Sequence, residues 1–268
     1  MFDCGPASTL KMVRMGLRPQ DVTHLFFTHH HSDHNADYPC FLLTHWEQSR
    51  SESQLRIYGP PPTTSMTEKL VGPGGVFWAD INARINDPGS KHVFVERGGT
   101  LPRPDPCFLT KDISAGTTIE TDEWRVTAGH AQHAQPYLEC LAYRIETEDV
   151  VVTFTGDTGP CAEVSELASG SDLLLCMCWD EQTRLDASGA SRLGCVCGSG
   201  DAARLAKETN SRQLVLMHST ASLDDAEIRA EAHAGIRDIY KGAATFAYEG
   251  LVLRRIASDG LWVDSTGS

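Results

Sequence analysis

The stretch Thr28-His29-His30-His31-Ser32-Asp33-His34 decides how this chain is interpreted. It follows the apolar run Val22-Thr23-His24-Leu25-Phe26-Phe27, which predicts a buried strand, and it precedes a predicted helix. Written as H-x-H-x-D-H, it brings His29, His31, Asp33 and His34 to the turn between the two. Imidazole and carboxylate are ligands that zinc prefers, and four of them suggest two ions. A His-rich solvated loop is the alternative interpretation.

The composition is typical of a globular protein, and its charge disfavours a nucleic-acid partner. At 268 residues, with 41% hydrophobic and 22% charged residues, the chain is long enough for one large domain with its own core. The formal charge is -13, from 23 Lys and Arg against 36 Asp and Glu. Because phosphate neutralisation supplies most of the affinity for nucleic acids, this balance disfavours a nucleic-acid partner and favours small or neutral substrates.

Cysteine usage and hydropathy predict a cytoplasmic protein. The nine cysteines include no C-x-x-C pair, and Cys176-Met177-Cys178 and Cys195-Val196-Cys197 favour buried thiols over a structural zinc knuckle. A reducing compartment follows from this usage. No apolar stretch reaches the ~18 residues of a membrane span, so no membrane association is expected.

The rest of the chain predicts two sheets packed face to face with helices outside, in a single domain over residues 1–268. Residues 63–106 are harder to assign, and their Phe77, Trp78 and Phe94 either line a pocket or pack a lid. The predicted strands are 55–58, 124–127, 141–145, 150–154, 173–176, 214–217 and 251–253. The predicted helices are 7–16, 38–46, 66–70, 162–168, 200–208 and 224–234.

The His-rich stretch resembles the signature of the metallo-β-lactamase superfamily, and its Thr-His-x-His start is similar to the branch containing ribonuclease Z and arylsulfatase-type hydrolases. The resemblance implies an α/β fold, the αββα four-layer sandwich, with 63–106 as a lid or substrate-covering insertion. Asp3-Cys4-Gly5 resembles the family's D-x-G turn, whose Asp supports the metal loop. Because further strands normally precede that turn, the chain is expected to lack the first N-terminal strands.

The resemblance also implies the remaining ligands. His133 precedes Ala134-Gln135-Pro136 and fits the family's H-x-Q-P form, while His130 stays the alternative. Asp157 follows an apolar run and suits a bridging ligand, and His218 follows the predicted strand 214–217. Carried over residue by residue, the resemblance implies two Zn²⁺ ions. The first is held by His29, His31 and His133, and the second by Asp33, His34 and His218, with Asp157 bridging.

The implied activity is that of a zinc-dependent metallohydrolase. A hydroxide bridging two zinc ions would attack a small-molecule substrate such as an ester, a sulfate or a chlorinated aromatic. Asp33 is the predicted catalytic residue that handles the proton while serving as a ligand. The resemblance leaves room for a homodimer.

One departure from the ribonuclease Z pattern affects the choice of substrate. Enzymes of that kind carry a further histidine between the bridging aspartate and the last ligand, and no histidine lies between Asp157 and His218. This disfavours tRNA 3′ processing, which stays an alternative, as does a metal-binding protein without catalysis.

Two residues at the end of strand 173–176 are predicted to serve the substrate. Trp179 would bind it and Asp180 would act as a catalytic acid, in a Met177-Cys178-Trp179-Asp180 segment similar to that of hydrolytic dehalogenases of chlorinated aromatics. Core packing by Trp179 and helix capping by Asp180 are the alternatives.

Overall fold

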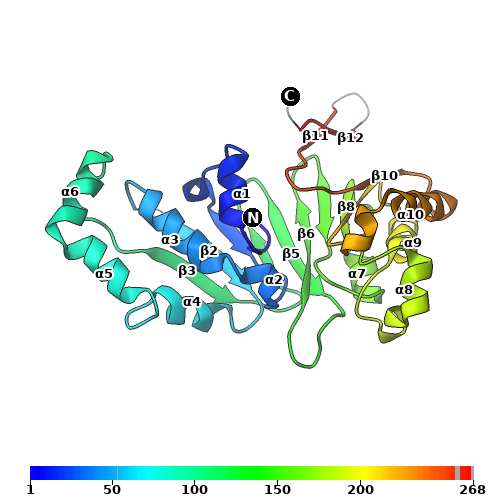
Figure 1. Ribbon diagram of the computed structural model, residues 1–268, viewed down its shortest axis with the longest axis horizontal. Helices are drawn as coiled ribbons and strands as arrows, with labels where there is room; N and C mark the ends of the chain where they lie inside the picture. Colours follow the sequence, from blue (N-terminus) through cyan, green and yellow to red (C-terminus); the bar gives the residue numbers. More distant parts are fainter. Residues whose placement is uncertain (53, 257–259, 267–268) are drawn as a thin grey trace. The chain divides into compact units, whose positions relative to one another are not determined.

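A computed structural model describes residues 1–52, 54–256 and 260–266. The chain forms two compact units, residues 1–113 and the residues from 114 onward (Figure 1). In each unit helices flank a sheet, so the predicted α/β class is confirmed. The face-to-face packing of the sheets and the single domain stay predictions.

The first unit contains a parallel sheet in the order β1 (His24–Phe26), β2 (Gln54–Gly59), β3 (Cys107–Asp112). Parallel neighbours need crossover connections, and helices supply them. Between β1 and β2 lie α2 (Ser32–Asn35) and α3 (Tyr38–Gln48), and between β2 and β3 lie α4 (Thr63–Val71), α5 (Trp78–Asn86) and α6 (Pro88–Glu96). The helix α1 (Ser8–Arg14) and a 3₁₀ turn at Pro19–Asp21 precede β1. The sheet and α3 bury a core that includes Leu25, Phe27, Phe41 and Ile57.

The segment 63–106 is more regular than its sequence predicts. It forms the three helices α4, α5 and α6, and the Asp87 side chain caps α6 by accepting a hydrogen bond from the Ser90 backbone N–H. Phe77 and Trp78 pack against the core of the first unit, and Trp78 also lines a pocket beside Phe108. The role of 63–106 as a lid or substrate-covering insertion stays a prediction.

The second unit contains a seven-stranded mixed sheet in the order β10-β9-β8-β7-β6-β5-β4. Antiparallel pairing joins β4 (Thr118–Glu120), β5 (Arg125–His130), β6 (Leu141–Glu146) and β7 (Val151–Phe154). Parallel pairing joins β7, β8 (Leu173–Met177), β9 (Gln213–Met217) and β10 (Ala243–Phe246). The flanking helices are α7 (Ala162–Leu167), α8 (Gln182–Ser188), α9 (Ser199–Glu208) and α10 (Ala226–Ile239), with 3₁₀ turns at Ala190–Leu193 and Ala221–Asp224.

The predicted last strand, 251–253, has the wrong bounds. A separate antiparallel pair forms there, β11 (Leu253–Arg255) with β12 (Trp262–Asp264). No helix among the residues that the structure describes is long and apolar enough to cross a membrane.

Three predicted site residues follow parallel strands of the second unit, at one edge of its sheet. The carboxyl ends of β7, β8 and β9 lie side by side because the three strands are parallel neighbours. Asp157 follows β7, Trp179 follows β8 and His218 follows β9. Small residues on α9, including Ala202 and Ala203, let this helix pack closely against the buried side chains of β8 and β9.

Candidate metal centre

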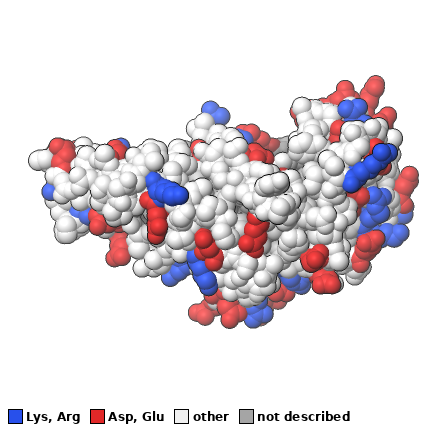
Figure 2. Space-filling view, turned by 90° about the horizontal axis from the view of Figure 1, so that it is seen from below, with Lys and Arg blue, Asp and Glu red and all other residues white. Residues whose placement is uncertain are grey.

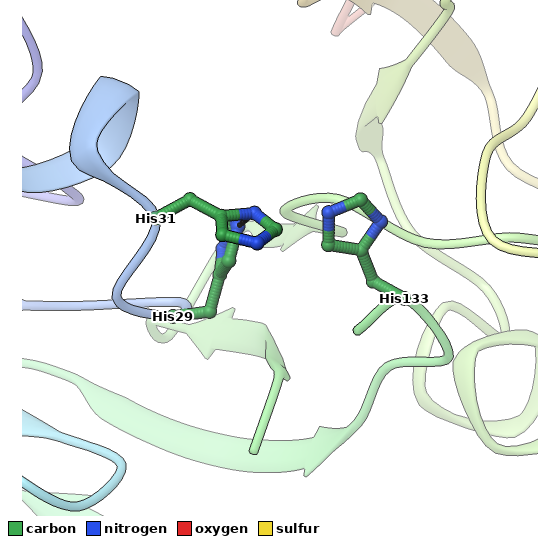
Figure 3. Close-up of side chains that lie close together, drawn as sticks. All are labelled: His29, His31 and His133. Carbon is green, nitrogen blue, oxygen red and sulfur yellow. Dashed lines mark hydrogen bonds between the residues drawn. The ribbon is translucent and has the colours of Figure 1, made fainter. Parts of the chain in front are cut away.

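In the first unit, β1 delivers the His-rich stretch to the start of α2. His29 is fully buried, and its Nε2 lies 3.0 Å from Nδ1 of His31 (Figure 3). Two nitrogen ligands on one tetrahedral zinc, each at 2.0–2.1 Å from it, are about 3.4 Å apart. The separation of these two ring nitrogens is therefore close to that of two ligands on one ion.

Asp3 supports the His-rich stretch, as its resemblance to a D-x-G turn implies. Its carboxylate accepts hydrogen bonds from the Thr28 backbone N–H at 2.7 Å, from the Thr28 hydroxyl at 2.8 Å and from His34 Nδ1 at 2.8 Å. Since a carboxylate only accepts, Nδ1 of His34 carries the proton and Nε2 carries the lone pair. That Nε2 lies 3.4 Å from Oδ2 of Asp33.

Thr28 fixes the tautomer of His29 in the same way. The Thr28 hydroxyl has one proton and donates it to Asp3, so its oxygen accepts from Nδ1–H of His29 at 3.0 Å. The lone pair of His29 therefore lies on Nε2, the atom that faces His31.

A glycine allows the D-x-G turn to approach this stretch. A Cβ atom at Gly5 would lie 2.2 Å from the backbone oxygen of Asp33, so only glycine fits there. Asp3 itself has a φ of 53°, in the left-handed region that few non-glycine residues occupy.

In the second unit, the Asp157 carboxylate lies between two histidines. Its Oδ2 is 3.6 Å from Nε2 of His133 and 3.5 Å from Nε2 of His218. His133, labelled in Figure 3, comes from the connection between β5 and β6, and His218 comes from the end of β9. Asp157 is only 4% exposed, so its carboxylate is held in a fixed position.

A backbone carbonyl orients His133. The carbonyl oxygen of Cys195 accepts a hydrogen bond from His133 Nδ1 at 2.7 Å, which leaves the lone pair on Nε2, facing Asp157. The backbone of Gly159 packs closely against the residue that precedes Cys195. A Cβ atom at Gly159 would lie 1.9 Å from the oxygen of Gly194. His130, the alternative ligand, is the last residue of β5.

Trp179 and Asp180 have different surroundings. The Trp179 ring stacks on the His218 ring, with centroids 6.1 Å apart and an interplanar angle of 23°, and 38% of Trp179 is exposed. Oδ1 of Asp180 accepts hydrogen bonds from Ser222 Oγ at 2.7 Å, the Glu181 backbone N–H at 2.8 Å and Arg184 Nε at 3.3 Å. Trp179 thus offers an aromatic face beside a predicted ligand, whereas Asp180 binds neighbouring protein groups.

Sequence reasoning missed the supports of the ligands. Thr28 directly precedes His29, and its hydroxyl was the available signal. The Cys195 carbonyl and the Ser222 hydroxyl gave no signal, because the first belongs to the backbone and the second lies in a short 3₁₀ turn without a sequence motif.

The predicted ligand set suits divalent metal ions, which the family implies. It supplies five imidazoles and two carboxylates, a mixture of nitrogen and oxygen donors that zinc accepts. Three of the imidazoles, those of His29, His34 and His133, have the second ring nitrogen hydrogen-bonded to a protein oxygen. This second contact is the usual arrangement for a metal-binding histidine.

Comparisons with known proteins identify the relatives of this chain. Residues 1–219 match the family model described as Beta-lactamase superfamily domain. A ribonuclease Z from Mycobacterium sp. (strain KMS) is 30% identical over 176 residues, which cover 65% of this chain and 56% of that protein. The alignment thus spans little more than half the length of this relative.

Solved structures share the fold. The metallo-beta-lactamase fold protein YhfI from Bacillus subtilis has a TM-score of 0.68 at 17% identity, covering 98% of this chain and 86% of that one. The short form of human tRNase Z has a TM-score of 0.60 at 17% identity, covering 92% of this chain and 85% of that one. Both are similar to this chain in fold.

Proposed function

Because this chain belongs to the metallo-β-lactamase superfamily, in its ribonuclease Z branch, we propose that it is a zinc-dependent hydrolase acting on a small-molecule ester, sulfate or chlorinated aromatic. The observation that carries the proposal is the position of the Asp157 carboxylate oxygen, about equally far from Nε2 of His133 and Nε2 of His218. One carboxylate between two imidazoles that come from separate loops is the arrangement that a bridging ligand requires.

The proposed site has two metal positions. His29, His31 and His133 would hold one ion, and Asp33, His34 and His218 would hold the other, with Asp157 bridging. Family membership supports this assignment, and so do the hydrogen bonds that leave Nε2 of His29, His34 and His133 as the nitrogen with the lone pair. The contact between His133 and Asp157 favours His133 over His130 as the third histidine.

The chemistry divides between the metal and the chain. Bound divalent ions lower the pKa of water toward ~7 and polarise the group under attack. Asp33 would take the proton released in the attack, and the 55% exposure of its side chain supports this role. Trp179 offers its exposed face to an apolar or aromatic part of the substrate.

A second candidate is the endonuclease activity named in the curated relatives, ribonuclease Z. The relatives favour it, while the formal charge of -13 and the absence of a histidine between Asp157 and His218 disfavour it. On the face drawn in Figure 2, acidic and basic side chains are interspersed, whereas phosphate binding would be served by a continuous basic area.

A metal measurement combined with a substrate panel tests the proposal. We expect purified, zinc-supplemented protein to contain close to two zinc ions and to cleave activated esters, aryl sulfates or chloroarenes. We expect Asp157→Ala to lose both metal and activity and His130→Ala to keep both. A protein that holds no zinc after supplementation contradicts the proposal. Cleavage of precursor tRNA at low salt that His31→Ala abolishes identifies the endonuclease, and full metal loading without turnover identifies an inert metal-binding protein.

A further inference from the structure

His218 has a backbone conformation that its surroundings must maintain. Its φ is 57°, in the left-handed region that glycine and asparagine adopt more readily than histidine. A residue in this region persists only where neighbouring structure holds it, and such residues cluster at functional sites. The interactions that hold the segment after β9 therefore bear directly on the predicted last ligand.

The segment that follows β8 makes these interactions. Cys178 donates its backbone N–H to the Met217 carbonyl at 2.7 Å, and the Trp179 carbonyl accepts from the Thr220 backbone N–H at 2.9 Å. The two hydrogen bonds lie on either side of His218 in the sequence, and the Trp179 ring stacks on the His218 ring. Residues 178–180 thus contact the last ligand and its neighbours on both sides.

One side-chain pair completes this connection. Ser222 Oγ donates to Asp180 Oδ1 at 2.7 Å and, having used its one proton, accepts from Thr220 Oγ1 at 2.6 Å. Glu181 N–H and Arg184 Nε bind the same Oδ1, so the carboxylate is fixed to the start of α8. The Asp180 carbonyl accepts from Ser199 N–H at 3.0 Å, which fixes its backbone to the start of α9.

We propose that Asp180 is a positioning residue, which acts through Ser222 to hold the 218–222 segment in the conformation that orients the His218 ring. This proposal rests on the proposed function in one respect, namely that the His218 ring binds a metal ion. It replaces the predicted catalytic acid, because every contact of Asp180 Oδ1 is made as an acceptor from protein groups. Three such donors on one carboxylate oxygen suit a structural task.

A double-mutant cycle tests this role through two measurements. Asp180→Ala and Ser222→Ala are compared with the double variant, and Asp186→Ala, which removes a carboxylate on the exposed side of α8, is the matched control. Zinc affinity is measured by chelator competition, and amide hydrogen exchange at Thr220 and Leu223 is measured on the metal-free protein.

We expect each single variant to weaken the binding of one zinc ion about tenfold or more, and to speed exchange at both amides about tenfold. The double variant should be no weaker than the worse single variant, because the two residues share one hydrogen bond. Unchanged exchange in Asp180→Ala overturns the proposal. An altered pH–rate profile in that variant with unchanged zinc affinity also overturns it and restores the catalytic acid. If the wild-type protein binds no zinc, the proposed function fails, while the exchange measurement still tests the role of Asp180.

Discussion

The Asp3 carboxylate accepts a hydrogen bond at 2.8 Å from Nδ1 of His34, a residue 31 positions further along the chain. A predicted metal ligand is thus oriented by a turn that precedes the first strand. Ligand-supporting groups of this kind typically contribute 10–100-fold to metal affinity.

We therefore expect Asp3→Asn to weaken zinc binding about 10–100-fold. Asparagine is chosen because it tolerates the left-handed backbone at this position, whereas alanine would add strain. Chelator competition measures the affinity, and Asp21→Asn, at an exposed ion pair with Arg18, serves as the control. Equal zinc affinities in Asp3→Asn and the wild-type protein would show that the carboxylate does not orient the ligand.

Gly159→Ala should shift the ring of His133 indirectly, through the segment that accepts its hydrogen bond. The new Cβ would overlap the oxygen of Gly194, so the segment whose Cys195 carbonyl holds His133 must move. We expect a loss of about 1–3 kcal/mol in the free energy of unfolding, measured by urea titration, together with weaker zinc binding. Gly235→Ala, on α10 with open space at its Cβ, should be neutral or slightly stabilising. Wild-type zinc affinity in Gly159→Ala would contradict the proposed part of the Cys195 carbonyl.

His45 should make stability depend on pH in a defined direction. Burial lowers the pKa of this imidazole below its ordinary value of 6.5, although a hydrogen bond to the Val22 carbonyl acts the other way. Because the folded-state pKa is the lower one, the unfolded chain takes up the proton first as pH falls. The contribution of neutral His45 to the free energy of unfolding is fully present above pH 6.5. It is lost as pH falls from 6.5 through the folded-state pKa of His45.

We expect His45→Gln, which keeps a hydrogen-bond donor but does not titrate, to reduce this dependence. Thermal unfolding from about pH 7.5 to about pH 5.5 measures the pH dependence, with the wild-type protein and the variant both free of metal. A wild-type Tm that falls no more steeply than that of the variant would exclude His45 as a source.

Arg103 should contribute more to stability than its neighbour Arg97. The side chain of Arg103 is 3% exposed, it pairs with Glu47, and its guanidinium lies 4.1 Å from the Trp46 ring centroid and 4.9 Å from that of Phe94. Arg97 pairs with the same Glu47 from a half-exposed position. We expect Arg103→Ala to cost about 3 kcal/mol and Arg97→Ala less than about 1 kcal/mol. Urea unfolding of both variants decides this, and equal losses would contradict the expectation.

Sequence patterns predicted the elements that carry strong periodicity or strong punctuation. The apolar run before His29 forms β1, and the runs at 173–176 and 214–217 form the buried strands β8 and β9. The Asp3 turn also makes the supporting contacts that its resemblance implies. Each of these depends on a few neighbouring residues, so local sequence suffices to identify it.

Other features depend on contacts that are distant in sequence. Strand β3 has a half-exposed pattern, and β10 consists of Ala243-Ala244-Thr245-Phe246, so neither resembles a buried strand until it pairs with its neighbour. The left-handed conformation of His218 likewise has no sequence signal, since glycine or asparagine is the usual occupant. Whether Asp180 binds a substrate or a neighbouring loop depends on Ser222, 42 positions away.

The Cys195 carbonyl that orients His133 belongs to the peptide backbone, and this affects how the surrounding segment tolerates mutation. Every amino acid supplies the same oxygen at this position, so the tautomer of His133 does not depend on which side chain position 195 carries. Position 195 can therefore exchange its side chain, provided the backbone path of this segment against Gly159 is kept. A substitution at position 195 could alter the chemistry that this loop offers while His133 keeps its hydrogen bond.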